Sequence, residues 1–186
     1  MDDFKPVISE CIAGNQKAMA ELYHQFAPKM FGVCLRYAKD SGEAEDNMQD
    51  GFIKVFANLS NFRNDGSLEG WIRRIMINVS LEKIRKQHLL YPVEDVSKYD
   101  SVNFSDDVIA KISADDLMKV IQELPPRYRL VFNLYVIEGY SHQEIAKEMS
   151  ITQGTSKSNL SRAREILKKK VQENFGEMRG QNNNTA

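Results

Sequence analysis

Apolar side chains recur at three- and four-residue steps along most of this chain, and this is the spacing of one face of an α-helix. Leu22, Phe26, Met30 and Val33 form one such series. No segment shows the alternation of apolar and polar residues that marks a half-buried strand. With 42% hydrophobic and 27% charged residues, the composition is that of an ordinary globular protein. We therefore predict an all-α fold with a buried core.

The helical spacing dissolves between residues 91 and 112, where Asp and Ser residues dominate and Pro92 stops the preceding helix. A chain of 186 residues has the length of one ordinary domain or two small ones. We expect two small helical domains joined by a flexible acidic linker. Helices are predicted over about 17–39, 43–59 and 67–89, and the spacing returns from Leu117 onward, with a break at two prolines. The predicted segments are a first domain over 1–90, a linker over 91–112, a second domain over 113–176 and a disordered tail over 177–186.

The formal net charge is only −1, but the charges are segregated along the sequence. Residues 71–86 carry five bases against one acid, and residues 141–170 carry seven bases against three acids. Residues 40–50 carry five acids and no base. Basic stretches attract phosphates, so we predict two nucleic-acid-facing surfaces and a separate acidic surface for something else.

Several kinds of site are not expected. No apolar run approaches the roughly 18 residues of a membrane span, and the acidic start MDDFKPV is unlike a secretory signal. Cys11 and Cys34 are expected to be reduced core thiols, and no histidine lies at metal-ligand spacing from a cysteine or carboxylate. A Gly-rich phosphate loop and a nucleophile elbow are both missing. We expect a cytoplasmic protein that is not an enzyme, without membrane insertion, cofactor or metal.

A helix-turn-helix is predicted in the second half of the chain. Ser141 and Glu144 have the spacing of a capping box that begins a helix. A short turn follows at Ser150, where Thr152 can cap a second helix that continues to about residue 170. In such a motif, cations reach phosphates and short polar side chains reach base edges in the major groove. A helical hairpin with a merely solvated basic face is the alternative.

Three segments carry a more specific signal. They are AED-x-x-QD at 44–50, the tryptophan segment FRNDGSLEGWIRRIMINVSLEKIRKQ at 62–87, and the stretch from LPPRYR at 124 to RAR at 164. The first two resemble region 2, and the third resembles region 4, of the extracytoplasmic-function sigma factors of bacterial RNA polymerase. The resemblance covers about residues 15–90 and 114–172. It implies a protein without chemistry of its own, with core RNA polymerase as its partner and promoter DNA as its ligand.

In that family the AED-x-x-Q helix docks on the largest subunit of the polymerase. The resemblance therefore implies a polymerase-binding face, and the helical spacing places these residues away from the apolar stripe. A solvated acidic face is the alternative. The predicted core-polymerase-binding residues are Glu45, Asp46, Gln49, Asp50 and Lys54.

Region 2 of the family also recognises the −10 promoter element, whose bases it captures as single strand. Cations hold the backbone in such sites, and polar or aromatic groups hold unpaired bases. The spacing places Trp71 beside Leu68 and Ile72, so we expect this tryptophan in the core rather than in the DNA site. The predicted −10 residues are Phe62, Arg63, Asn64, Asp65, Arg73, Arg74, Asn78, Arg85 and Lys86.

Region 4 of the family reads the −35 element as duplex DNA with the second helix of the helix-turn-helix. The commonest family pattern has glycine, valine, arginine and histidine at the positions of Ser150, Ser156, Asn159 and Ser161. We therefore expect a −35 sequence unlike that of better-known members. The predicted −35 residues are Thr155, Ser156, Lys157, Ser158, Asn159, Ser161, Arg162 and Arg164.

The resemblance further implies an anti-sigma factor, of a kind often anchored in the membrane, that covers the polymerase- and DNA-facing surfaces. Two hypotheses from other classes compete with this one. A stand-alone helix-turn-helix regulator with an N-terminal sensor would not need both an AED-x-x-QD helix and a basic tryptophan helix. The other hypothesis is a cytoplasmic enzyme, and no motif in the sequence supports it.

Overall fold

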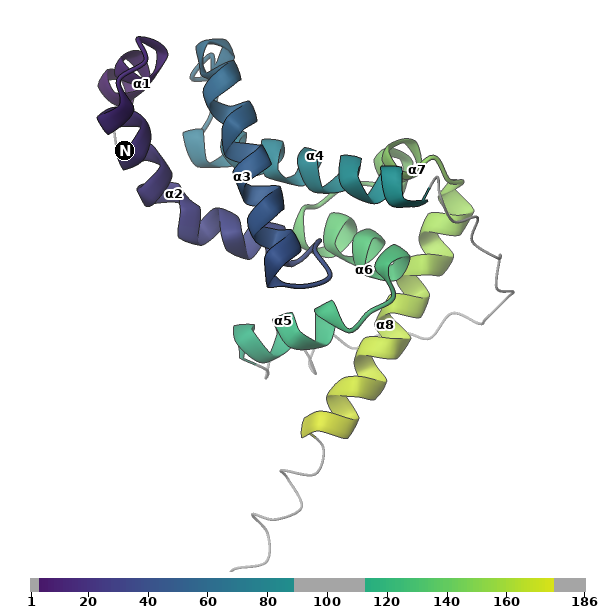
Figure 1. Ribbon diagram of the computed structural model, residues 1–186. Helices are drawn as coiled ribbons and strands as arrows, with labels where there is room; N and C mark the ends of the chain where they lie inside the picture. Colours follow the sequence, from purple (N-terminus) through teal and green to yellow (C-terminus); the bar gives the residue numbers. More distant parts are fainter. Residues whose placement is uncertain (1–3, 89–112, 176–186) are drawn as a thin grey trace, which may run out of the picture. The chain divides into compact units, whose positions relative to one another are not determined.

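The computed structural model describes residues 4–88 and 113–175, and the regular structure in both ranges is helical (Figure 1). No strand occurs in either range, which confirms the all-α prediction. The chain divides into two compact units, Met1–Pro92 and Val93–Ala186. The predicted linker at 91–112 and the predicted tail at 177–186 lie outside the described residues.

Three long helices pack against one another in the first unit, and a short helix and a 3-10 turn accompany them. The apolar stripes predicted from the spacing face this packing. Leu22, Val55 and Ile72, one from each long helix, are at most 1% exposed. The elements are α1 (Lys5–Ile12), α2 (Gln16–Leu35), α3 (Ser41–Asn58), η1 (Leu59–Asn61) and α4 (Leu68–His88).

Helix α1 is missing from the sequence predictions. It packs against α2 and buries Ile8 and Cys11, and Phe4 just before it contacts Phe26 with ring centroids 5.6 Å apart. An eight-residue helix with two buried side chains is too short for its periodicity to stand out. Cys11 and Cys34 are both free and buried, as predicted.

Local side-chain contacts fix the start of α3. Asp40 Oδ1 accepts a hydrogen bond from the Glu43 backbone N–H at 2.8 Å and caps the helix. The Glu43 carboxylate in turn accepts from the backbone N–H of Lys39 at 2.6 Å. Pro28 lies inside α2, which continues through it.

Two helical glycines have opposite surroundings, so the same substitution should have opposite effects. A Cβ on Gly51 of α3 would collide with Sδ of buried Met76 and lie 2.9 Å from its Cε, whereas a Cβ on Gly32 of α2 would meet nothing within 4 Å. We expect Gly51→Ala to lower the free energy of unfolding by about 1–2 kcal/mol, because overpacking outweighs helix propensity. Gly32→Ala should raise it by about 1 kcal/mol.

Urea unfolding followed by the fluorescence of Trp71, the single tryptophan of the chain, measures both variants. A Gly51→Ala protein as stable as Gly32→Ala would contradict the close approach of α3 and α4.

In the second unit, α8 packs against α5, α6 and α7. Its inward side carries an apolar stripe, in which Leu160, Ala163, Leu167 and Val171 are all buried. The elements are α5 (Ala114–Gln122), α6 (Pro126–Phe132), η3 (Asn133–Ile137), α7 (His142–Met149) and α8 (Gln153–Phe175).

A π-helical turn, η3, follows α6. The backbone N–H of Glu138 donates to the carbonyl of Asn133, five residues back, at 3.0 Å. Leu134 is fully buried in this turn, while Tyr135 and Val136 are 37% and 46% exposed. The turn therefore brings two large apolar side chains to the surface of the unit.

Helices α7 and α8 form the predicted helix-turn-helix. The capping box is complete, because Ser141 Oγ accepts from the Glu144 N–H at 3.2 Å and the Glu144 carboxylate accepts from the Ser141 N–H at 2.8 Å. Thr152 Oγ1 accepts from the Thr155 N–H at 3.0 Å and caps α8. Both helices therefore begin at the capping side chains that were predicted from the sequence.

The turn between α7 and α8 contains a residue in an unfavourable backbone conformation. Ser150 has φ 54° and ψ 43°, the left-handed region that costs a residue with a Cβ roughly 1–2 kcal/mol. We expect Ser150→Gly to raise the stability of the second unit by about 1 kcal/mol. Slower amide hydrogen exchange in α7 and α8 would measure this gain.

Asn64, with φ 62°, provides the matched control in the first unit. Asparagine tolerates the left-handed region, so Asn64→Gly should change stability less. Faster exchange in α7 and α8 of the Ser150→Gly protein would contradict the prediction.

Candidate docking and nucleic-acid surfaces

The predicted polymerase-binding residues share the outward side of α3. Ala44, Met48 and Val55 of the same helix are buried and form its inward face. The polar residues between them in the sequence therefore lie on the opposite, outward face. This exposure agrees with the sequence prediction. The exposed residues are Glu45, Asp46, Gln49, Asp50 and Lys54.

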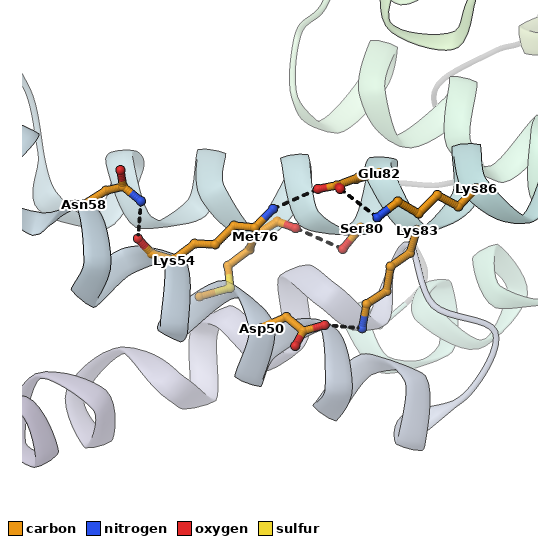
Figure 2. Close-up of polar contacts among 8 residues, drawn as sticks. All are labelled: Asp50, Lys54, Asn58, Met76, Ser80, Glu82, Lys83 and Lys86. Carbon is orange, nitrogen blue, oxygen red and sulfur yellow. Dashed lines mark hydrogen bonds and ion pairs between the residues drawn. The ribbon is translucent and has the colours of Figure 1, made fainter.

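Two of these residues form ion pairs with α4 (Figure 2). Lys83 Nζ lies 2.7 Å from Asp50 Oδ2, and Lys54 Nζ lies 2.8 Å from Glu82 Oε2. The second Glu82 oxygen accepts from Lys86 Nζ at 2.9 Å. Hydrogen bonds lower the pKa of Glu82 to about 2, and the bond from Lys54 has a larger effect than the bond from Lys86. An ionised carboxylate therefore links α3 to the basic helix α4 at neutral pH.

The structure corrects the prediction for Trp71. This side chain is only partly buried, and its ring lies against Phe62 with centroids 5.5 Å apart and planes at 53°. Trp71 lies in the first turn of α4, at the edge of the apolar stripe, where a ring from the preceding loop packs on it. Arg63, Asn64 and Asp65 are exposed in that loop. A pair of partly accessible aromatic rings therefore adjoins three exposed polar side chains.

Helix α4 presents the remaining −10 candidates. Arg74, Asn78 and Arg85 are exposed and share one side of the helix, because steps of four and seven residues return to the same face. Arg73 is partly buried, and Lys86 is exposed and paired with Glu82. The arrangement places cations near the aromatic pair at the start of α4 and again near its end.

Two predicted −35 residues are not on the surface of α8. Ser156 is 0% exposed and Asn159 is 7% exposed. Both lie one turn before the buried Leu160 and Ala163 and continue the packed stripe, so the prediction that they face DNA is wrong. Of the other predicted residues, Lys157 and Ser158 are exposed. The remaining ones are partly buried, namely Thr155, Ser161, Arg162 and Arg164.

His142, at the start of α7, provides the buried Ser156 hydroxyl with a hydrogen-bonding partner. Its Nδ1 lies 2.9 Å from Ser156 Oγ, and its ring stacks on Tyr135 with centroids 4.5 Å apart. Sequence reasoning assigned this histidine no role. Burial lowers the pKa of His142, and the charges of Lys157 and Arg164 lower it further.

This lowered pKa predicts how acid affects the second unit. The folded unit binds a proton at His142 less readily than the unfolded chain does, so its stability should fall as pH drops below about 6.5. Asparagine can keep a hydrogen bond at the Nδ1 position without titrating. Hydrogen exchange of α8 is measured for His142→Asn and for wild type, side by side, at pH 7.5 and at pH 5.5. We expect the loss of protection between pH 7.5 and pH 5.5 to be smaller in His142→Asn than in wild type. An unchanged acid sensitivity in the variant would contradict this assignment.

Each of the two units matches a known family model. The family model described as Sigma-70 region 2 matches residues 22–89, and the model described as Sigma-70, region 4 matches residues 114–167. The first match contains the α3 face and α4, and the second contains the helix-turn-helix.

Curated relatives agree over most of the chain. The ECF RNA polymerase sigma-E factor of Escherichia coli K12 is 32% identical over 171 residues, which cover 86% of this chain and 89% of that protein. The RNA polymerase sigma-H factor of Pseudomonas aeruginosa is 31% identical with the same coverage. The ECF RNA polymerase sigma factor SigE of Mycolicibacterium smegmatis is 32% identical over 83% of this chain and 63% of that protein.

Among solved structures, the sigma factor RpoE in complex with the anti-sigma factor NepR from Bartonella quintana covers 82% of this chain and 96% of its own. Its TM-score is 0.48 and its sequence identity 21%.

Within the residues that the structure describes, no helix has the length and hydropathy to cross a membrane. No group of three or more His, Cys, Asp and Glu side chains among them is arranged to hold a metal ion.

Proposed function

This chain belongs to the extracytoplasmic-function family of RNA polymerase sigma factors, and we propose that three helix faces divide promoter recognition among them. As a sigma factor, it acts with core RNA polymerase in transcription initiation at promoter DNA. The proposed division assigns polymerase docking to the outer face of α3, the −10 element to α4 and the loop before it, and the −35 element to α8. The observation that carries it is the exposure of polar and basic side chains on three helices whose opposite faces form the cores.

For the −10 element, the proposed site combines an aromatic pair with cations. Phe62 and Trp71 offer partly exposed rings, and Arg63 and Arg74 lie close to them in sequence on the loop and on α4. Stacking of an unpaired base on an aromatic ring is worth about 1–3 kcal/mol. Such a surface suits separated strands better than a duplex, in which the base faces are covered.

For the −35 element, the proposed readers are the residues of α8 that remain accessible. Lys157 and Ser158 are exposed in its first turns, where recognition helices contact base edges and phosphates. Ser156 and Asn159 act through packing instead. Arg162 and Arg164 are assigned to the phosphate backbone.

The remaining expectations belong to the same proposal. The protein carries no catalytic activity of its own and works in the cytoplasm, where its polymerase is. An anti-sigma factor holds it inactive by covering the proposed surfaces. A stand-alone regulator is not favoured, because the region 2 model matches the first unit as well.

Run-off transcription on a genomic fragment library tests the proposal. Core polymerase from the source organism is assayed with and without this protein, and the 5′ ends are sequenced. We expect protein-dependent starts that share two upstream motifs at a fixed spacing. Unchanged start sites, together with duplex DNA binding by the protein alone, would favour the stand-alone regulator instead.

A further inference from the structure

An isoleucine with an exposed side chain lies on the proposed docking face. Ile53 of α3 is 67% exposed, the largest value among the exposed large apolar residues of the described ranges. It follows Gln49 by four residues and Asp46 by seven, so the three side chains share one face of the helix. Its neighbours Phe52 and Val55 are buried in the first unit. Ile53 is therefore directed away from a core that its neighbours help to form.

The charged residues on either side of Ile53 are already paired within the unit. Asp50 is held by Lys83 at 2.7 Å, and Lys54 is held by Glu82 at 2.8 Å (Figure 2). Both pairs join α3 to α4. Asp50 and Lys54 are thus suited to positioning the face rather than to contacting a partner.

The acids nearer the start of α3 differ from Asp50. Glu45 and Asp46 are exposed and make no ion pair with a described residue. The face therefore carries two unpaired carboxylates at one end and an isoleucine at the other, with Gln49 between them. A complementary partner would place cations opposite the acids and an apolar recess opposite Ile53.

We propose that Ile53 is the apolar anchor by which α3 docks on core RNA polymerase, in a recess of a surface that is basic beside it. The inference rests on the proposed assignment of this face to the polymerase and adds the residue that contributes most to its affinity. Interfaces concentrate their binding energy in a few central side chains that become fully buried, and the polar residues around them exclude water. Burial of an isoleucine side chain corresponds to a roughly 10- to 100-fold gain in affinity.

Substitution of Ile53 by serine tests the proposal, because the two residues have similar helix propensity and the site lies outside the core. The affinity of the full-length chain for purified core polymerase is measured by fluorescence anisotropy. We expect Ile53→Ser to weaken binding roughly 10- to 100-fold and Ile53→Leu to keep it within a few-fold. Urea unfolding followed by Trp71 fluorescence should be the same for Ile53→Ser and wild type.

Ile12 provides the matched control. It is another exposed isoleucine of the first unit, 53% exposed at the end of α1 and outside the proposed face. Ile12→Ser should leave the affinity unchanged. Equal affinity of Ile53→Ser and wild type, or equal losses in Ile53→Ser and Ile12→Ser, would overturn the anchor while leaving the sigma function intact. Absence of core binding by the wild-type chain would overturn the proposed docking function and the anchor with it.

Discussion

Truncation of Ile72 to alanine should lower the free energy of unfolding of the first unit by about 2–5 kcal/mol. Ile72 is 0% exposed in α4, which packs on both α2 and α3, so its removal leaves a cavity where three helices meet. Small domains are stable by only about 5–15 kcal/mol in total. The variant should therefore unfold at a clearly lower urea concentration than wild type. Trp71 lies in this unit and reports its unfolding in urea.

Ile53→Ala is the control for this truncation. It removes the same atoms from a side chain that is 67% exposed, and surface substitutions usually change stability by about 0.5 kcal/mol or less. Hydrogen exchange of α8 should be unchanged in Ile72→Ala if the second unit folds on its own contacts. Similar losses of stability in both isoleucine variants would contradict the core that the structure describes.

Promoter binding by the complex of core polymerase and this protein should weaken steeply as salt rises. A protein with 6–10 phosphate contacts loses about 10³–10⁵ in affinity between 50 and 200 mM salt. The proposed DNA surfaces supply enough cations for this range by themselves. These cations are Arg63, Arg73, Arg74, Arg85, Lys86, Lys157, Arg162 and Arg164.

Single substitutions separate the contributions of the two DNA surfaces. Removal of one phosphate contact should reduce the slope of log affinity against log salt by about 0.9 for duplex DNA and about 0.7 for single strands. We expect Lys157→Ala to show the first change and Arg74→Ala the second, in filter-binding or anisotropy titrations at several salt concentrations. Lys119→Ala removes an exposed lysine that pairs with Asp116 on α5, outside both surfaces, and should leave the slope unchanged. A slope that is the same in all three variants would count against the assigned surfaces.

Much of the fold could be predicted because long amphipathic helices leave a regular pattern in the sequence. The stripes through Leu22, Val55 and Ile72 are buried as the spacing required. Helix α1 was missed because its pattern is short. The π-turn at η3 was missed because its extra residue depends on hydrogen bonds that no composition signal marks.

The candidate surfaces were predictable in outline but not residue by residue. Spacing alone places Ser156 four residues before Leu160 and seven before Ala163, in register with the packed stripe, so its burial could have been read from the sequence. Trp71 was misplaced for the opposite reason, since the periodicity of α4 does not reveal that this side chain is partly exposed and packs on a ring from the preceding loop. The pairing of Asp50 and Lys54 with α4 depends on how two helices cross, which a one-dimensional pattern does not contain.

The polar residues of α8 are under two different constraints, and this difference governs how easily promoter preference can evolve. A mutation at Ser156 or Asn159 alters packing, so it carries a stability cost whatever it does to DNA reading. Lys157 and Ser158 are exposed and can be exchanged with little effect on the unit. On the proposed assignment of the −35 element to α8, selection can therefore sample new base preferences at these two positions one mutation at a time, without first acquiring a compensating substitution in the core.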